Sequence, residues 1–396
     1  MLVQCCLNLF FRQMMKKSFI YIIVAIFITT IGFCQQMVGA KGTGLNRADA
    51  LQDALRNAVG MAVGVSLRSE TKVENYMVIS DAIASNTSGY IKNYTISKEI
   101  PFPDRYEVNI QAEVTTNSLE ADFKLLTKSI GGVRFLVMVD PEVKNEKELK
   151  DLQFATERIM SYMAEKGYRY VDQSRLKSLQ NERSNLMQAS NPQLSYAQQL
   201  AVMSNAQFII IVSQIKTEDV KGAFDIVQGK KVSFLAKAYD NCTGEGLGTI
   251  SLETMPQKGS SENINQAISR AVEVNFPKLM GMFGAYIGFW VNGGTPFEIR
   301  FYNSGTFRDL RTLRNKLKAD KNFGGDFEII GVNNYTKLEC TYKDKADELA
   351  DKILDYADEI PALKKQLIDV KMIYGRQINF APQSFIIPNL IKPIQQ

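Results

Sequence analysis

The residue types that could do chemistry in this chain are acids, lysines and tyrosines, because its 396 residues include no histidine. Without imidazole, Ser-His-Asp and Cys-His nucleophile systems and imidazole-ligated zinc sites are excluded. The best-placed acids are Asp140 and Glu142, directly after an apolar run, with Asp172 as a further neighbour. Carboxylates there could bind a cation or a sugar hydroxyl, or form the acid pair of a glycan hydrolase. Because no spacing signal supports such a pair, we interpret these acids as caps of strand ends.

Two glycine-rich segments could approach a ligand closely. Gly42-Thr43-Gly44 precedes a helical pattern and could hold a phosphate at a helix N-terminus. It lacks the Lys-Ser/Thr of a P-loop and the third glycine of a dinucleotide fingerprint, so we interpret it as a tight turn. Gly293-Gly294-Thr295-Pro296 is interpreted as a turn that leads into the last domain. We therefore expect no catalytic residue, no cofactor and no metal ion, and we expect that the protein is not an enzyme.

The N-terminal residues have the three parts of an export signal. A basic pair, Lys16-Lys17, precedes an apolar run of about 15 residues, Phe19–Phe33, and Cys34 provides a small residue at its end. Residues 1–34 are predicted to be a signal peptide cleaved before Gln35, with 1–13 as an over-extended start. The apolar run is too short to span a hydrocarbon core of ~30 Å comfortably. We expect an exported protein that is located in the periplasm. Association with the outer membrane is a further expectation.

Cysteine use and net charge narrow the class further. A lipoprotein acylated at Cys34 is the alternative to simple cleavage, and the bulky Phe33 before it disfavours that alternative. Beyond the leader only Cys242 and Cys340 remain, which is no disulfide framework, and we expect two separate thiols. The leader carries three cations and no acid, so the formal net charge of +5 falls to about +2 without it. A charge that small gives no basic field for nucleic acid.

The first predicted unit, residues 35–128, is an α+β domain. A strand at Met37–Lys41 precedes a helix at Asn46–Val63, in which alanines recur at helical spacing and form a narrow face of small residues. A second helical stretch, Asn75–Ser85, is followed by an antiparallel hairpin of Tyr90–Ile100 and Tyr106–Thr115. The alternation of apolar and polar residues in the last strand predicts one buried and one wet face.

This pattern resembles the N-terminal domain of flagellar assembly protein T and related envelope lipoproteins. The resemblance covers about a quarter of the mature chain and implies a scaffold or assembly domain without known catalysis. It is carried by Ala40-Lys41-Gly42, Ala48, Ala50-Leu51, Ala54-Leu55, Ala58, Gly64, Gly89-Tyr90-Ile91 and Tyr106-Glu107-Val108.

The second predicted unit, residues 129–285, is an α/β domain with a mixed sheet. Its expected order is a core strand, a helix ended by Gly167, a short strand, two helices, a second core strand, a hairpin and a long helix. The corresponding ranges are Arg134–Asp140, Glu146–Lys166, Tyr168–Val171, Ser174–Met187, Tyr196–Ser204, Phe208–Val212, Lys231–Tyr239, Gly246–Glu253 and Asn263–Met280. This order is similar to the middle domain of flagellar assembly protein T, to the periplasmic part of the curli secretion channel and to the N-terminal domain of the translocation protein TolB. The stretch Ile215–Lys230 is polar, which argues against a pore-forming segment.

The third predicted unit, residues 286–380, has the element order βαββαβ. That order matches the ferredoxin-like arrangement, in which two helices cover one face of a four-stranded antiparallel sheet. Its expected elements are Phe297–Tyr302, Thr306–Ala319, Phe327–Val332, Lys337–Tyr342, Ala346–Ala357 and Ile368–Tyr374. Flagellar assembly protein T is expected to end in a different, β-rich domain, so this departure counts against a flagellar role. Residues 381–396 contain three prolines and are predicted to be a flexible tail.

The function expected from these features is a non-enzymatic scaffold or assembly protein of the cell envelope. The alternative is a periplasmic binding protein for a peptidoglycan or polysaccharide fragment. The expected partners are envelope proteins, with peptidoglycan, the outer membrane or a second copy of the chain as further candidates, and no nucleic acid. The predicted contact surface is the polar side of the first long helix, formed by Arg47, Gln52, Asp53, Arg56 and Asn57.

Overall fold

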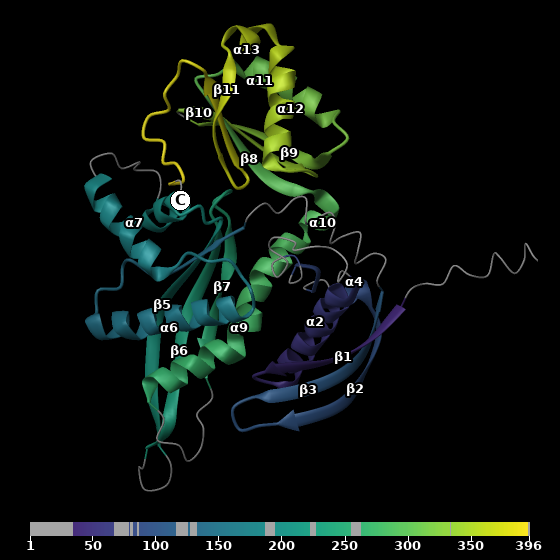
Figure 1. Ribbon diagram of the computed structural model, residues 1–396, viewed down its shortest axis with the longest axis vertical. Coiled ribbons are helices and arrows are strands. Elements are labelled where there is room, and N and C mark those ends of the chain that lie inside the picture. The colour runs from purple at the N-terminus through teal and green to yellow at the C-terminus, as the bar shows by residue number, and fades with distance from the viewer. Residues whose placement is uncertain are drawn as a thin grey trace, which may run out of the picture.

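The computed structural model describes residues 35–66, 79, 82–84, 87–115, 126, 133–186, 195–221, 227–254, 263–332 and 334–394. These residues form three sheets, one in each predicted unit, so the predicted multidomain α+β class is confirmed (Figure 1). The predicted signal peptide, 1–34, and most of the predicted helix at 75–85 lie outside the described residues. No helix within the described ranges is long and apolar enough to cross a membrane.

The first unit is a three-stranded antiparallel sheet covered on one face by a helix. The strand order is β1-β3-β2. The helix α2 lies against β1 and β3 through Ala50, Ala54 and Ala58, which are fully buried, so the predicted alanine face is the one that packs. The elements are β1 (Gln35–Gly44), α2 (Arg47–Ser66), the short helix α4 (Thr87–Tyr90), β2 (Ile91–Pro101) and β3 (Tyr106–Thr115).

Gly42 and Gly44 lie in strand β1 and not in the tight turn that their sequence suggested. All ten residues of β1 pair with β3, and the strand ends only at Gly44. A Cβ on Gly42 would stand 2.1 Å from the Ala54 nitrogen and 2.2 Å from the Ala50 oxygen. The glycines are therefore present because the strand passes against the backbone of α2, where no side chain fits. The prediction of a turn was wrong for that reason.

The second unit has a mixed four-stranded sheet, as predicted, in the order β4-β5-β6-β7. Strands β4 and β5 run parallel, and the other neighbours are antiparallel. The predicted short strand at Tyr168–Val171 is reduced to one bridge between Tyr170 and Phe135. The elements are β4 (Phe135–Val139), α6 (Glu146–Glu165), α7 (Gln173–Leu186), α8 (Tyr196–Met203), β5 (Phe208–Lys221), β6 (Val227–Asp240), β7 (Gly246–Glu253), α9 (Ile264–Gly288) and α10 (Trp290–Gly293).

Helices cover both faces of this sheet around strand β4. Phe135 and Val137 of β4 belong to the apolar cluster that includes α6 and α9, whereas Leu136 and Met138 belong to the cluster with α7 and α8. A strand covered on both faces needs apolar residues at consecutive positions, which explains the unbroken apolar run of β4. The cluster on the α9 side continues into the alanine face of α2, so the first and second units share one core.

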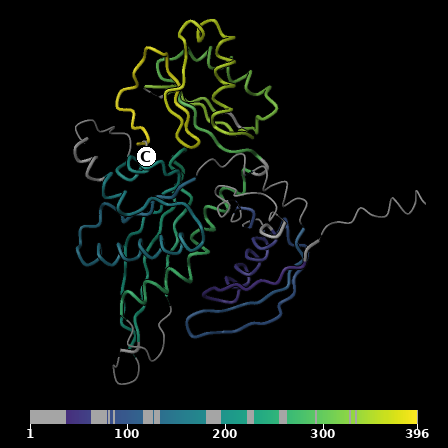
Figure 2. Tube along the Cα trace, in the orientation of Figure 1, coloured from purple at the N-terminus to yellow at the C-terminus, as the bar shows by residue number. Residues whose placement is uncertain are grey.

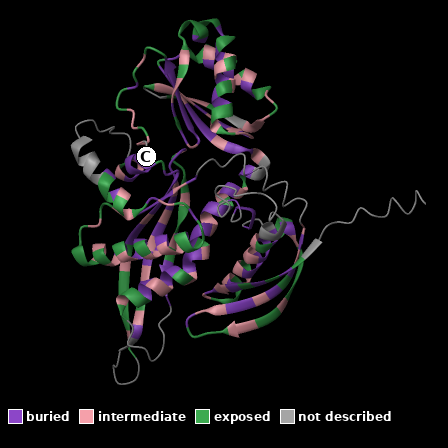
Figure 3. Cartoon of the chain, in the orientation of Figure 1, coloured by how far each residue is buried: buried purple, intermediate pink, exposed green. Residues whose placement is uncertain are grey.

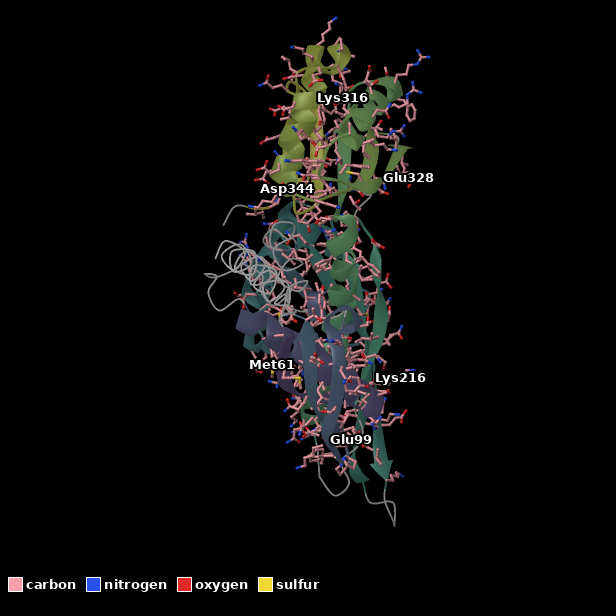
Figure 4. The ribbon with its side chains drawn as sticks, turned by 90° about the vertical axis from the view of Figure 1, so that its right-hand side faces the viewer. Met61, Glu99, Lys216, Lys316, Glu328 and Asp344 are labelled. Carbon is pink, nitrogen blue, oxygen red and sulfur yellow. The ribbon has the colours of Figure 1, made fainter. Side chains whose placement is uncertain are left out.

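Strands β5 and β6 extend beyond the rest of the sheet as a two-stranded arm. The predicted core strand ended at Val212, but pairing with β6 continues to Lys221. In the arm most of the β5 side chains are exposed, as the green segments of Figure 3 show. Lys216 lies at the outer edge of the molecule in Figure 4. Backbone pairing with β6 maintains the arm, Val232 of β6 is buried at its base, and Lys230 adds an ion pair to Asp219.

The third unit has the predicted element order but a different sheet. An additional strand, β12, follows β11 and inserts between it and β8, so the order is β11-β12-β8-β10-β9. Strand β12 runs parallel to β8. The sheet is therefore five-stranded and mixed, and the predicted four-stranded antiparallel ferredoxin-like sheet is corrected. The elements are β8 (Thr295–Tyr302), α11 (Phe307–Lys318), β9 (Phe323–Val332), β10 (Tyr335–Tyr342), α12 (Ala346–Asp358), α13 (Pro361–Lys365), β11 (Ile368–Tyr374) and β12 (Gln377–Pro382).

The predicted flexible tail, 381–396, is packed along its described part. Ala381 is the penultimate residue of β12, and Ile387 is 7% exposed. The chain then returns to the second unit, where the Ile394 N–H donates to the Met203 carbonyl at 3.0 Å. Figure 2 shows the yellow end of the trace reaching the teal second unit. The prolines indicated an extended backbone correctly, but Ile387, Leu390 and Ile391 pack on the second and third units, while Ile386 is exposed.

Candidate functional site

The acids singled out in the sequence are engaged in local turns. The Asp140 carboxylate accepts the Glu142 N–H at 3.0 Å, directly after β4. The Asp172 carboxylate accepts the hydroxyl of Ser174 and, at 2.8 Å, its N–H at the start of α7, and these bonds lower the pKa of Asp172. The interpretation of Asp140 as a cap of a strand end is confirmed. These acids satisfy backbone N–H groups rather than forming a paired-acid site.

The predicted contact surface on α2 is largely occupied by other parts of the chain. Arg47 holds Glu99 of β2 in a forked ion pair, with nitrogen–oxygen distances of 2.6–3.0 Å. Asp53 accepts the Thr43 N–H at 2.9 Å, and Asn57 donates to the Lys41 carbonyl at 2.8 Å, so both connect α2 to β1. Gln52 and Arg47 are the exposed members of the five, and Arg47 is held by its ion pair with Glu99.

Arg56 lies at the joint between the first and second units, not on a free surface as predicted. Its Nη1 donates to the carbonyl of Pro277 in α9 at 2.5 Å. The guanidinium lies over Gly281, where an added Cβ would stand 2.5 Å from Nη2. The predicted place of Arg56 on the contact surface is therefore corrected, while the role of α2 in binding a partner stays a prediction that now depends on Gln52 and the exposed part of Arg47.

We expect Arg56→Glu to destabilise the protein by about 1.5–3 kcal/mol, the usual contribution of a hydrogen bond to a charged group. The substitution removes the donor to Pro277 and places a carboxylate beside its carbonyl oxygen. The free energy of unfolding in urea measures this loss. Gln52→Glu, on the exposed side of the same helix, is the matched control and should change stability by less than about 0.5 kcal/mol. If the two substitutions changed stability equally, Arg56 would not contribute to the contact between the first and second units.

A cleft of about 940 Å³ lies between the second and third units and is the candidate functional site. Three elements far apart in the sequence form it. Its floor is the face of the third sheet opposite helices α11 and α12, one wall is the β6–β7 turn with α8, and the C-terminal segment is its roof. The polar and charged residues of its lining include Gln198, Thr243, Arg300, Tyr302, Tyr335 and Gln377.

The floor of the cleft is a cationic and aromatic surface. Arg300 and Tyr302 alternate along β8 with Ile299 and Phe301, which face the helices and are buried. Tyr335 of β10 lies directly opposite Tyr302 in the sheet, and their ring centroids are 4.9 Å apart. The Arg300 guanidinium carbon stands 5.2 Å from the centre of the Tyr335 ring. A planar cation and two phenol rings are thus held side by side, a combination that recognises polar ligands with flat faces.

Arg300 is positioned by a buried acid behind it. The Glu298 side chain is 4% exposed and forms an ion pair with Arg300, while Lys337 approaches the same carboxylate at 3.9 Å. Burial raises the pKa of Glu298, and the charges of Arg300 and Lys337 oppose that rise. The pair orients the guanidinium, because Nε and Nη2 both bond to Oε1 of Glu298. Glu298 itself is not among the residues that line the cleft.

The two units that form the cleft are connected by a buried ion pair. Arg376, in the turn between β11 and β12, places Nη2 2.6 Å from Oδ1 of Asp240 at the end of β6. The two side chains are 6% and 0% exposed. The guanidinium carbon also stands 4.4 Å from the centre of the Trp290 ring. Tyr286 donates its hydroxyl to Oδ2 of Asp240 at 2.7 Å, so the carboxylate is fully satisfied where water is excluded.

The turn between β11 and β12 packs into the second unit. The Tyr374 hydroxyl is buried, donates to the Ala206 carbonyl and accepts from Asn241 Nδ2 at 2.9 Å. Gly375 has φ +54°, and a Cβ there would stand 2.7 Å from the Cys242 sulfur. Burial raises the pKa of the Cys242 thiol to about 12, so this cysteine stays protonated and is no nucleophile. The expected separate thiols are present, because Cys242 and Cys340 are both free and buried.

The lining determines what the cleft can do. Among the described residues that line it, Arg300 is the one charged side chain, and none is an acid. Amide and hydroxyl groups cover the floor and wall, while Ile387, Leu390 and Ile391 make the roof apolar. A pair of carboxylates for glycan hydrolysis has no counterpart in this lining. The arrangement is suited to holding a polar ligand with some apolar surface.

Sequence reasoning missed this site. Arg300 fell in a predicted strand, Phe297–Tyr302, in which Glu298, Arg300 and Tyr302 stand at alternate positions. The signal available was a strand in which one face carried a glutamate, an arginine and a tyrosine in succession. These residues identify a binding site only once the structure shows that the second unit and the C-terminal segment cover this face of the sheet.

No family model matches the chain, and no curated protein matches it. Among solved structures, lipoprotein GNA1162 from Neisseria meningitidis is similar at 13% identity and a TM-score of 0.22, over 33% of this chain and 85% of that chain. A putative neuraminyllactose-binding hemagglutinin homolog from Helicobacter pylori is similar at 10% identity and a TM-score of 0.20, over 38% of this chain and 87% of that chain. At these scores neither likeness carries an argument. The resemblance to flagellar assembly protein T stays a prediction.

Proposed function

We propose that this chain is an exported, non-enzymatic protein of the cell envelope that binds a peptidoglycan or polysaccharide fragment in the cleft between its second and third units. The observation that carries the proposal is the lining of the cleft. It combines a cation, two tyrosines and several amide and hydroxyl groups, with no acid among its described residues. Saccharides present many hydroxyls and flat apolar ring faces, and such a lining offers partners to both.

The size and rigidity of the cleft support a binding role. Ligand pockets commonly have volumes of ~300–1,000 Å³ and are largely formed before the ligand arrives. The cleft, at about 940 Å³, is at the upper end of that range. The Asp240–Arg376 ion pair and the β11–β12 turn fix the wall of the cleft, in the second unit, relative to its floor, in the third unit. A preformed site avoids part of the ordering cost of binding.

The test is saccharide binding by the full mature chain, measured by isothermal titration calorimetry with short glycan and peptidoglycan fragments. Tyr335→Leu should weaken binding by about tenfold or more, because it removes a ring and a hydroxyl from the floor of the cleft. Tyr94→Leu, at an exposed tyrosine of β2 in the first unit, is the matched control and should bind normally. No binding of any fragment at millimolar concentration would refute the proposal.

The scaffold hypothesis is the second candidate, and the β5–β6 arm favours it. The arm extends beyond the helices and exposes charged residues, including Lys216 and Glu218, along a regular two-stranded ribbon. The contact of Arg56 with α9 connects the first unit to the second, and the contact of Tyr374 with Asn241 connects the third unit to the second. The three units would therefore hold the arm and other exposed surfaces at fixed separations. Affinity purification from envelope fractions, with and without competing saccharide, distinguishes a protein partner from a cleft ligand.

A further inference from the structure

We infer that the cleft selects an acidic saccharide, one whose carboxylate binds Arg300 while its sugar ring lies against Tyr335 and Tyr302. This inference rests on the proposed saccharide-binding function and specifies the ligand class. Three features of the described residues support it: the charge of the lining, the orientation of the guanidinium, and the division of the cleft into a polar floor and an apolar roof.

The charge of the lining favours an anion. Arg300 lines the cleft, whereas the acid that pairs with it, Glu298, is 4% exposed and is not among the lining residues. Lys337 also approaches Glu298, and Lys337 in turn pairs with Glu339. The four charges cancel in sum but are separated in space, so a ligand in the cleft meets the cation first. In a partly desolvated site that separation has a larger effect than it would in water.

The guanidinium of Arg300 is oriented for a second partner. A guanidinium has five N–H donors in one plane, and Glu298 takes those of Nε and Nη2 on one side. The side chain is 20% exposed and lines the cleft, where it also hydrogen-bonds with the Tyr302 side chain. A carboxylate in the cleft can bind the exposed part of the guanidinium, alongside Tyr302, through charge-assisted hydrogen bonds. Because Glu298 and the Tyr335 ring already fix the rotamer, binding costs little side-chain entropy.

The rest of the cleft favours a saccharide over a bare organic acid. The rings of Tyr302 and Tyr335 adjoin the guanidinium, so a sugar ring attached to the bound carboxylate would lie beside them. Gln377 and Thr243 provide amide and hydroxyl groups further along the cleft. The roof, with Ile387 and Leu390, offers an apolar surface for the methyl of an N-acetyl or lactyl group.

The experiment compares two disaccharides that differ by one acidic group, using the full mature chain and titration calorimetry. The acidic probe is N-acetylglucosaminyl-N-acetylmuramic acid, and the neutral probe is N,N′-diacetylchitobiose, which lacks the lactyl carboxylate. We expect the acidic probe to bind about tenfold tighter or better, as one charge-assisted contact would produce. Raising the salt concentration should reduce that preference.

Arg300→Met should remove the preference, so that the two probes bind this variant with affinities within about twofold of each other. Because this substitution leaves Glu298 buried without its main partner, the double variant Arg300→Met/Glu298→Gln provides a second test in a fold without that penalty. Arg308→Met, at an exposed arginine of α11, is the matched control and should keep the preference.

The outcomes separate the inference from the proposed function. Equal binding of the two probes by the wild-type chain overturns the inference and leaves saccharide binding intact. A preference that survives both Arg300 variants also overturns it, because the carboxylate would then bind elsewhere. Binding of an N-acetylated dipeptide with a free carboxylate, without binding of either disaccharide, refutes both statements.

Discussion

Replacing Arg376 by methionine is expected to destabilise the protein by about 3–5 kcal/mol, the usual effect of removing one partner from a buried ion pair. Asp240 is fully buried, and the substitution leaves its charge facing the apolar side chain of methionine beside Trp290. The free energy of unfolding in urea, followed by Trp290 fluorescence, is the measurement, because Trp290 is the one tryptophan of the chain. We expect the third unit to separate from the second before the remaining structure unfolds.

A second ion pair in the same unit provides the control. Lys316 of α11 pairs with Glu359, with side-chain exposures of 33% and 57%, and Figure 4 places Lys316 on the outside of the third unit. Lys316→Met should cost less than about 1 kcal/mol, because exposed pairs contribute little. The double variant Arg376→Met/Asp240→Asn should recover part of the loss, since it also removes the unpaired charge. If Arg376→Met and Lys316→Met have the same small effect, the buried pair does not hold the two units together.

Strand periodicity and apolar runs predicted the elements well where a single sheet face determines the pattern. The alternation in Tyr106–Thr115 located β3, and the bounds predicted for β7 and β11 are those of the structure. The apolar runs at Phe135–Val139 and Phe208–Val212 located the two core strands that helices cover on both faces. Such patterns are reliable because burial of one face imposes them residue by residue.

The errors arose where a distant segment determines the role of a residue. Strand β12 was missed because Gln377–Pro382 is buried on both faces and has no alternation, and Pro382 suggested a loop. Arg56 looked like an exposed helix residue because α9, more than 200 positions later, is what covers it. The cleft has only a weak local signal in β8, since its lining comes from residues 198 to 391. Sequence periodicity records which face is buried but not which segment buries it.

Gly42 is another residue whose role is determined by the segment that covers it, here helix α2. We expect Gly42→Ala to destabilise the first unit by about 3 kcal/mol, at the upper end of the ~1–3 kcal/mol typical of overpacking. The new Cβ would stand 2.1 Å from the Ala54 nitrogen and 2.2 Å from the Ala50 oxygen, which are backbone atoms of a helix. Helix α2 would have to move away from β1, and that movement opens the contacts of its alanine face. Urea unfolding and amide hydrogen exchange in α2 measure the two consequences.

Gly39 of the same strand is the matched control. Its nearest neighbour for an added Cβ is the Nε2 of Gln111 at 3.0 Å, the end of a flexible, exposed side chain that can move aside. Gly39→Ala should therefore be neutral or stabilising, since glycine inside a strand costs about 0.5–1 kcal/mol relative to alanine. Comparable stability of the two variants would contradict the close approach of β1 to α2.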